Sequence, residues 1–228
     1  IVCTILTCLT RAYFQSVDRA DHFIDISKCM SYSWHPVENL GSPFLMVDEA
    51  TFVIPKGGEI RLTKNHFKFL FILEGSIEHE IDGLEGRRIL KSGDILVAPV
   101  VREHRYINAS PNKAQALHLV RLFLDGAALE EHALKRVRKP EVELIDYILH
   151  YFPTVVQLSD GVDNAISELL VALREEAAGD QVGSRHRVRS ICTDLIIAVS
   201  RKLIEAKQDR IPVNGTSATH LVVGVKEY

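Results

Sequence analysis

The sequence has few cysteines, few aromatic residues and no long apolar segment. Its four cysteines, at positions 3, 8, 29 and 192, form no Cys-x-x-Cys pair. This spacing argues against a disulfide framework and favours a reducing, cytoplasmic location. The apolar stretch at residues 1–10 is too short to span a bilayer and lacks the charged start of a signal peptide. We therefore expect no membrane role, and a truncated or processed boundary at this end of the chain.

The sequence also has no large excess of positive or negative charge. The 228 residues include 27 Lys and Arg against 30 Asp and Glu, which gives a net charge of −3. Because binding to phosphates requires a net basic face, this segment is not expected to contact nucleic acid itself. A hydrophobic fraction of 46% with 25% charged residues is sufficient for a buried core and gives no sign of disorder.

Residues 43–125 read as a succession of short β-strands separated by Gly, Asn, Asp and Pro. The expected strands lie at 52–55, 59–63, 68–75, 76–81, 87–91, 94–99, 103–108 and 115–124. Closely spaced short strands joined by tight turns are typical of an antiparallel barrel or sandwich rather than of a parallel sheet with crossover helices.

After Asp125 the hydrophobic period changes to that of helices. We expect helices at 142–152, at 164–176 with Asp163 as N-cap, and at 185–207 with Ser184 as cap. The last of these is apolar on two sides, so it is either sandwiched within the fold or packed against a partner chain. The predicted fold class is α+β, an antiparallel β-barrel followed by a helical segment.

These patterns divide the chain into five parts. An N-terminal arm (1–42) precedes the barrel (43–125) and the helical segment (126–207). A polar stretch rich in Pro, Asn, Gly, Thr and Ser (208–219) has the composition of a linker. A periodic segment (220–228) then begins, and we expect it to be the start of a further, truncated domain.

The stretch "GDILVAPVVREHRYIN" (93–108) resembles the second conserved motif of the cupin superfamily. Gly93, Pro99, His104 and Asn108 stand at its spacing, while Val101 occupies the position of a second Gly. The resemblance implies a jelly-roll-like barrel that commonly holds a metal ion.

The first motif of metal-binding cupins does not match. Counting back from Gly75, Lys68 stands at the position of the Glu ligand, and Lys64 and Leu62 stand at those of the two His ligands. His66 falls on the position between them. One imidazole together with His104 provides too few donors for a catalytic metal, so we expect no metal and no cofactor.

The order of the barrel motifs, the helices, the polar linker and the final "VVGVKEY" resembles the amino-terminal region of the arabinose-responsive (AraC-type) bacterial transcription regulators. The resemblance covers roughly residues 45–228. It implies a metal-free barrel that senses a small molecule, a helical segment that pairs two chains, and DNA binding only through a C-terminal domain that is missing here.

Strand alternation suggests which side chains meet the ligand. His104 and Tyr106 share a face, and the resemblance implies that these positions and His118 lie at the pocket. All three can exchange hydrogen bonds with hydroxyls, which suggests a sugar-like effector. His118 could instead be a satisfied barrel histidine, and Tyr106 could be a core residue.

Four further residues complete the candidate set. His79 alternates with two apolar residues and is expected to point inward, and Arg61 could anchor a carboxylate or a pair of hydroxyls. Trp34 and His35, from the arm, could close the mouth of the barrel. Alternatively, Trp34 packs on the outside of the barrel.

The sequence thus predicts the effector-sensing and dimerisation region of a transcription regulator, with no catalytic activity and with the helix at 185–207 pairing two chains. The alternative is a cupin enzyme, either a metal-dependent one or a sugar isomerase or epimerase with His104 and Tyr106 as acid and base. A small cupin enzyme needs neither the long helix nor the truncated segment at the end.

Overall fold

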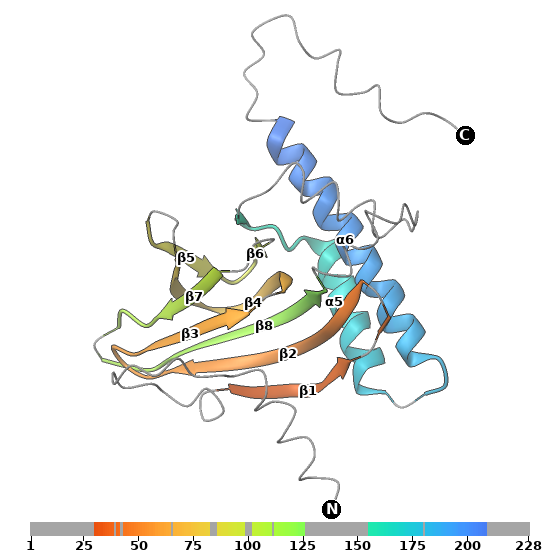
Figure 1. The fold of residues 1–228 in the computed structure, drawn as a ribbon, viewed down its shortest axis with the longest axis horizontal. Coiled ribbons are helices and arrows are strands. Elements are labelled where there is room, and N and C mark those ends of the chain that lie inside the picture. The colour runs from red at the N-terminus through yellow and green to blue at the C-terminus, as the bar shows by residue number, and fades with distance from the viewer. Residues whose placement is uncertain are drawn as a thin grey trace, which may run out of the picture.

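A computed structural model describes residues 30–38, 40–41, 43–64, 66–82, 86–98, 102–110, 112–125, 155–179 and 181–208. It confirms the predicted fold class, an antiparallel β-sheet domain followed by two helices that pack together (Figure 1). The strands are β1 (Met30–Glu38), β2 (Phe44–Ile54), β3 (Glu59–Lys64), β4 (Phe67–Ile81), β5 (Arg88–Lys91), β6 (Ile95–Ala98), β7 (Arg102–Ile107), β8 (Gln115–Leu124) and β9 (Val156–Leu158).

The strands form two layers that share β4. In the first layer the order is β1-β2-β8-β4-β6-β9, and in the second β7 pairs with β3 and β4 while β5 pairs with β4. Every pairing is antiparallel. We call the space between the two layers the barrel interior and the opposite side of the first layer the outer face.

Strand β4 continues through a point where the sequence suggested two strands, 68–75 and 76–81. Gly75 lies at this point with a φ of 95°, and a Cβ there would collide with the carbonyl oxygen of Ala116. A glycine is therefore required for the backbone to bend between the two layers without breaking the strand.

Two apolar cores result. One fills the barrel interior, and the other lies between the outer face and the helices. Strands β4 and β8 are buried on both sides over Phe67–Ile72 and Leu119–Leu124. This explains why their sequences are nearly continuous apolar runs rather than clean alternations.

The helices are α5 (Asn164–Ala178) and α6 (Ser184–Gln208). The predicted N-cap of the first is confirmed, because the Asp163 carboxylate accepts a hydrogen bond from the Ile166 N–H at 2.9 Å. The predicted cap of the second is wrong: Ser184 is its first helical residue, and the carbonyl of Gly183 accepts from the N–H groups of His186 and Arg187. The helix expected at 142–152 lies outside the described residues.

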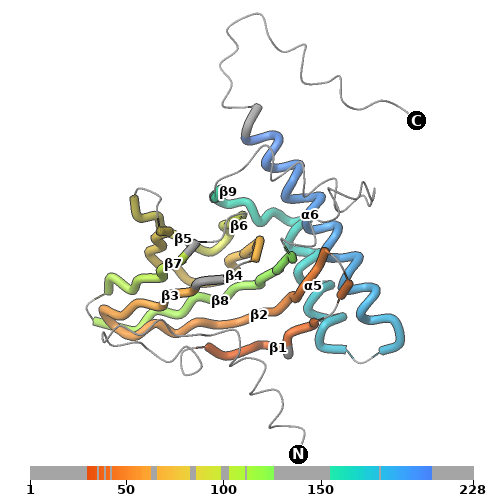
Figure 2. The backbone as a smooth tube through the Cα atoms, viewed as in Figure 1, coloured from red at the N-terminus to blue at the C-terminus, as the bar shows by residue number. Residues whose placement is uncertain are grey.

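Two strands lie where the sequence suggested none. β1 comes from the segment assigned to the arm, and it pairs with β2 along most of its length. β9 comes from the segment assigned to helices, and it pairs with β6 through Val156, Gln157 and Leu158 (Figure 2). The sheet therefore begins at Met30 and is completed by residues beyond 125.

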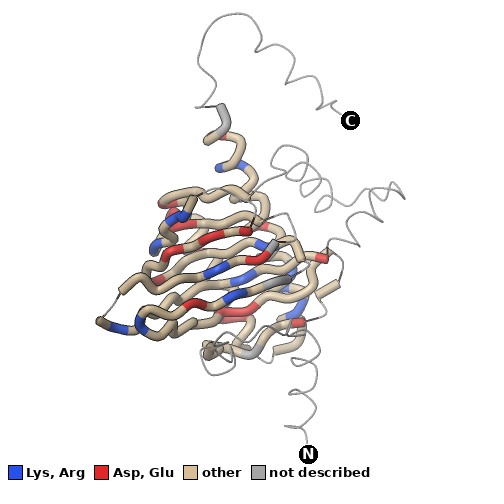
Figure 3. The backbone as a smooth tube through the Cα atoms, turned by 60° about the vertical axis from the view of Figure 1, so that its left-hand side comes forward, with Lys and Arg blue, Asp and Glu red and all other residues tan. Residues whose placement is uncertain are grey.

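Charged residues of both signs are interspersed on the strands rather than gathered in one patch (Figure 3). On the second layer, Arg105 pairs with Glu59 at 2.9 Å and with Glu80 at 3.0 Å. Neither α5 nor α6, the helices in the described part of the chain, combines the length and the apolar character needed to cross a membrane.

Candidate ligand-binding site

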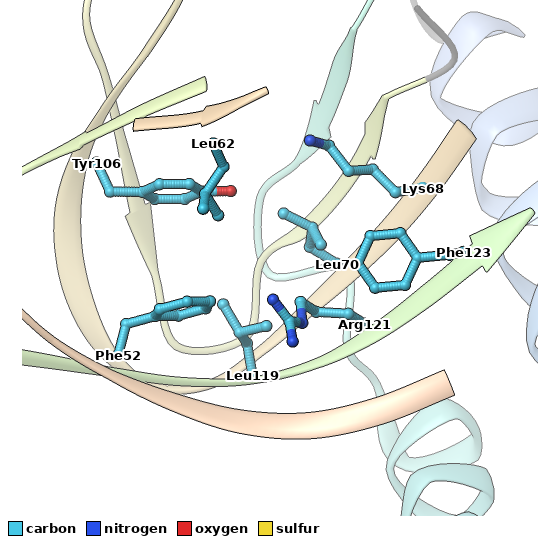
Figure 4. Close-up of a pocket in the computed structure, with 8 residues that line it drawn as sticks. All are labelled: Phe52, Leu62, Lys68, Leu70, Tyr106, Leu119, Arg121 and Phe123. Carbon is cyan, nitrogen blue, oxygen red and sulfur yellow. The ribbon is translucent and has the colours of Figure 1, made fainter. Parts of the chain in front are cut away.

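A small cavity lies in the barrel interior, and strands β2, β3, β4, β7 and β8 supply its lining. It is lined by Phe52, Leu62, Lys68, Leu70, Tyr106, Leu119, Arg121 and Phe123 (Figure 4). The space between these side chains measures about 290 Å³, including the part open to solvent, and its enclosed part has room for little more than a water molecule. A larger ligand therefore requires some of these side chains to move.

Two cationic side chains reach into this otherwise apolar space. Lys68 and Arg121 are buried, with only 3% and 4% of their surfaces exposed. Arg121 donates to both carboxylate oxygens of Asp48 from Nε and Nη2, each at 2.7 Å. Its guanidinium also lies 5.2 Å from the ring centre of Phe52 and 5.4 Å from that of Phe123. These contacts fix its position at the cavity wall.

A pair of buried histidines lies deeper in the barrel. His79 Nε2 and His104 Nδ1 share a hydrogen bond of 2.9 Å, and the ring centre of Tyr106 lies 4.9 Å from that of His79. Neither His79 Nδ1 nor His104 Nε2 has a hydrogen-bond partner among the described residues. One ring donates and the other accepts, so the pair leaves one buried donor and one buried acceptor for a further partner.

Both imidazoles are neutral near pH 7. Burial lowers the pKa of His79 to about 3, and the charges of Lys68 and Arg88 add to this effect. Burial likewise lowers the pKa of His104 to about 2, with Lys68 and His79 contributing. Burial raises the pKa of Tyr106 well above its usual value. The site therefore offers neutral hydrogen-bonding groups beside fixed positive charges.

The residues present do not fit the metal site of the cupin fold. Leu62 lies opposite His104 in the pairing of β3 with β7, and the neighbouring cavity position on β4 is Lys68. An aliphatic side chain and an ammonium group provide no electron pair for a metal at neutral pH. Among the described residues no group of three or more His, Cys, Asp or Glu side chains is placed to hold a metal ion.

Two of the predicted ligand residues lie on the outer face instead. Glu49 is buried there, and its carboxylate accepts hydrogen bonds from Trp34 Nε1 at 2.8 Å and His118 Nε2 at 2.7 Å. Arg174 of α5 donates to the same carboxylate from Nε at 2.9 Å and from Nη2 at 2.8 Å. We call these four residues the Glu49 cluster. It joins β1, β2, β8 and α5.

The other five predicted residues fall into three groups. His104, Tyr106 and His79 meet inside the barrel, as the strand alternation indicated. Arg61 is exposed on β3 and donates to Glu59 from Nε at 2.6 Å, so it lies apart from the cavity. His35 belongs to β1, but its side chain lies outside the described part of the structure.

Two residues of the motif that resembles the cupin family have structural roles in the fold. The Asn108 side chain donates to the carbonyls of Ile54, Pro55 and Lys113 at 2.9–3.0 Å, and so holds two turns together. Gly93 has a φ of 89° in the turn before β6. Of the motif residues described, only His104 faces the interior as a polar group.

Sequence reasoning missed Lys68 and Arg121 as pocket residues. Lys68 was considered only as a replaced metal ligand. Arg121 shares its face of β8 with Leu117, Leu119 and Phe123. A cation in the middle of an apolar face is the sequence signal that could have identified Arg121 as a pocket residue.

The geometry agrees with comparisons to known proteins. Residues 50–120 match the family model of the cupin domain. Together with the barrel and the paired helices, this match identifies the class: the chain contains a cupin domain followed by two helices that pack together. No curated protein matches the chain.

The solved structures that match the chain include several cupin proteins. A Cupin 2 conserved barrel domain protein from Salinispora arenicola is 18% identical over 54% of this chain and 96% of its own, with a TM-score of 0.34. The EutQ protein of Clostridium difficile is 16% identical over 41% of this chain and 67% of its own, with a TM-score of 0.31. An apo ToxT variant from Vibrio cholerae is 11% identical over 76% of this chain and 58% of its own, with a TM-score of 0.44.

Proposed function

We propose that the chain is the effector-sensing and dimerisation region of an AraC-type bacterial transcription regulator in the cytoplasm. The barrel binds a small ligand, expected from the sequence to be sugar-like, without a metal ion. The helical segment pairs two chains, and DNA is bound by a domain beyond the residues described. Catalysis is not part of this proposal.

The observation that carries the proposal is the way β2 connects the cavity to the helices. Asp48 points into the barrel and holds Arg121 at the cavity wall, while the next residue, Glu49, points outward and holds Arg174 of α5. A ligand that moves Arg121 therefore acts on a strand whose other side is bonded to the helices. A sensor requires such a connection, because a ligand alters a distant surface only by favouring one of two arrangements.

Dimerisation is assigned to α6. Its main apolar stripe, which includes Ile191, Leu195 and Val199, is buried against α5 and the outer face. Ile197 and Ile204, two turns apart, are only partly buried and are not packed against that core. These two side chains give the helix a second apolar side for a partner chain.

The alternative, a sugar isomerase or epimerase, draws on the buried grouping of His104 and Tyr106. A general acid or base works best when its pKa lies near the working pH. The pKa of His104 is lowered to about 2, and that of Tyr106 is raised. These shifts favour a binding role for both residues.

A reporter assay tests the proposed function. The chain is fused to a DNA-binding domain that represses only as a dimer, and repression is measured with the Ile197→Glu/Ile204→Glu double variant and the control Val182→Glu, whose side chain is fully exposed. We expect repression by the parent and the control and loss of repression in the double variant. A fusion that never represses, and a purified chain that is monomeric at high micromolar concentration in analytical ultracentrifugation, would refute the proposal.

A further inference from the structure

We infer that the ligand of the barrel is a small organic acid, whose carboxylate binds between Lys68 and Arg121 and whose body packs against the apolar wall of the cavity. This inference rests on the proposed function and deepens it, since it names the chemical class of the effector. It departs from the sugar-like effector suggested by the sequence.

The first support is the charge of the lining. Of the eight described residues around the cavity, two are cationic and none is acidic. Asp48 accepts from Nε and Nη2 of Arg121, and the Tyr32 side chain also contacts the guanidinium, so this cation is held in place before a ligand binds. Lys68 adds a second positive charge from β4, the strand that pairs with β8.

The second support is the direction in which the polar groups of the lining extend. The Lys68 ammonium group, the Arg121 guanidinium and the Tyr106 hydroxyl extend toward the same space from β4, β8 and β7 (Figure 4). A carboxylate has two oxygens, and each can accept from more than one donor. Three donors that converge from different strands match such a group better than they match a single hydroxyl. The charge of Lys68 also reaches the histidine pair, since it contributes to the lowered pKa of both rings.

The third support is the rest of the wall. Its other members, Phe52, Leu62, Leu70, Leu119 and Phe123, are apolar. A sugar carries a hydroxyl on most of its carbons and would bury several of them against these side chains without partners. A ligand with a carboxylate at one end of an apolar or aromatic body would bury no hydroxyl group against this wall. The small enclosed space favours a ligand of few atoms.

The test compares acids with neutral molecules of the same shape. Melting temperature and binding affinity of the full chain are measured with benzoate, hexanoate and glucuronate, and with benzamide, hexanamide and glucose. A ligand that binds only the native state raises the melting temperature. We expect at least one acid to stabilise the chain and to bind at least about tenfold more tightly than its neutral counterpart, because a hydrogen bond to a charged group contributes about that much.

Two variants identify the group responsible. Lys68→Met keeps the length and apolar stem of the side chain and removes its charge, so it should fold and lose the preference for the acid. Lys56→Met removes a charge from the exposed turn after β2 and should keep that preference. Circular dichroism and urea unfolding of each variant without ligand establish that it is folded.

The outcomes separate this inference from the proposed function. An acid preference that survives in Lys68→Met, equal binding of acids and neutral counterparts, or no stabilisation by any of the three acids overturns the inference. Binding of glucose alone, with a change in the dimer-dependent repression described above, overturns the acid inference and leaves the sensor function standing. Loss of repression in every fusion is a failure of the proposed function and not of the acid site.

Discussion

Removal of the Glu49 carboxylate should destabilise the protein more than removal of any exposed carboxylate. In Glu49→Ala the indole N–H of Trp34, which is 7% exposed, loses its acceptor. A buried donor left without a partner costs roughly 1–3 kcal/mol. The side chains of Arg174 and His118 are 49% and 24% exposed and can turn to water, so losing their contacts adds only about 1 kcal/mol.

The expected loss in the free energy of unfolding is therefore about 2–4 kcal/mol, measured by urea denaturation at pH 7. For a chain of this size that corresponds to a fall in melting temperature of roughly 4–16 °C. Glu205→Ala, at an exposed position of α6, is the matched control and should change stability by no more than about 0.5 kcal/mol. A loss below about 1 kcal/mol in Glu49→Ala would contradict the role assigned to the Glu49 cluster.

The pH dependence of this variant provides a second readout. Burial alone would raise the pKa of Glu49, but hydrogen bonds from Arg174, Trp34 and His118 and the charge of Arg174 outweigh it, so the pKa is lowered from its usual 4.5. A carboxyl whose folded pKa lies below its unfolded one stabilises the protein above the unfolded value and loses this contribution as the pH falls through the folded value. Stability should therefore fall below about pH 4.5 more steeply in the parent chain than in Glu49→Ala.

Three other predictions follow from single features. Gly75→Ala should lower the free energy of unfolding by more than about 3 kcal/mol or prevent folding, because φ at Gly75 is positive and a Cβ there would collide with the backbone of Ala116. The control is Gly57→Ala, which also has a positive φ but faces open space, and it should lose only about 1 kcal/mol in urea unfolding. Asn108→Ala removes three hydrogen bonds to carbonyls and should lose roughly 2–3 kcal/mol by the same measurement. Because the folded pKa values of His79 and His104, about 3 and about 2, lie below the usual 6.5, stability should decline by about 1 kcal/mol or more per pH unit for each ring as the pH falls below 6.5. Equal stability at pH 7.5 and pH 5.5 would show that these rings accept protons in the folded state.

The barrel could be predicted from the sequence because its strands are short, apolar and separated by turn residues. The strands β1 and β9 could not be predicted in this way. β1 contains Pro36 and polar residues, and β9 has only three residues, so each is held by pairing with a neighbour rather than by its own pattern. Segments of this kind become strands only when the rest of the sheet is present.

The site was predictable in part for a related reason. Alternation groups the residues of β8 into two sets, one with His118 and one with Arg121, but both faces of this layer are buried. The apolar pattern therefore does not reveal which set points into the barrel. His104 and His79 were found because they lie on strands of the second layer, where the other face is polar and partly exposed.

The position of Trp34 makes the protein its own optical probe. It is the single tryptophan of the chain, and its indole lies in the Glu49 cluster where β1, β2, β8 and α5 meet. Indole fluorescence depends on the polarity around the ring and on its hydrogen bond. Emission excited selectively at tryptophan therefore reports on this junction alone, with no label attached, and a change on ligand addition would give the timing and extent of the signal that passes from the barrel to the helices.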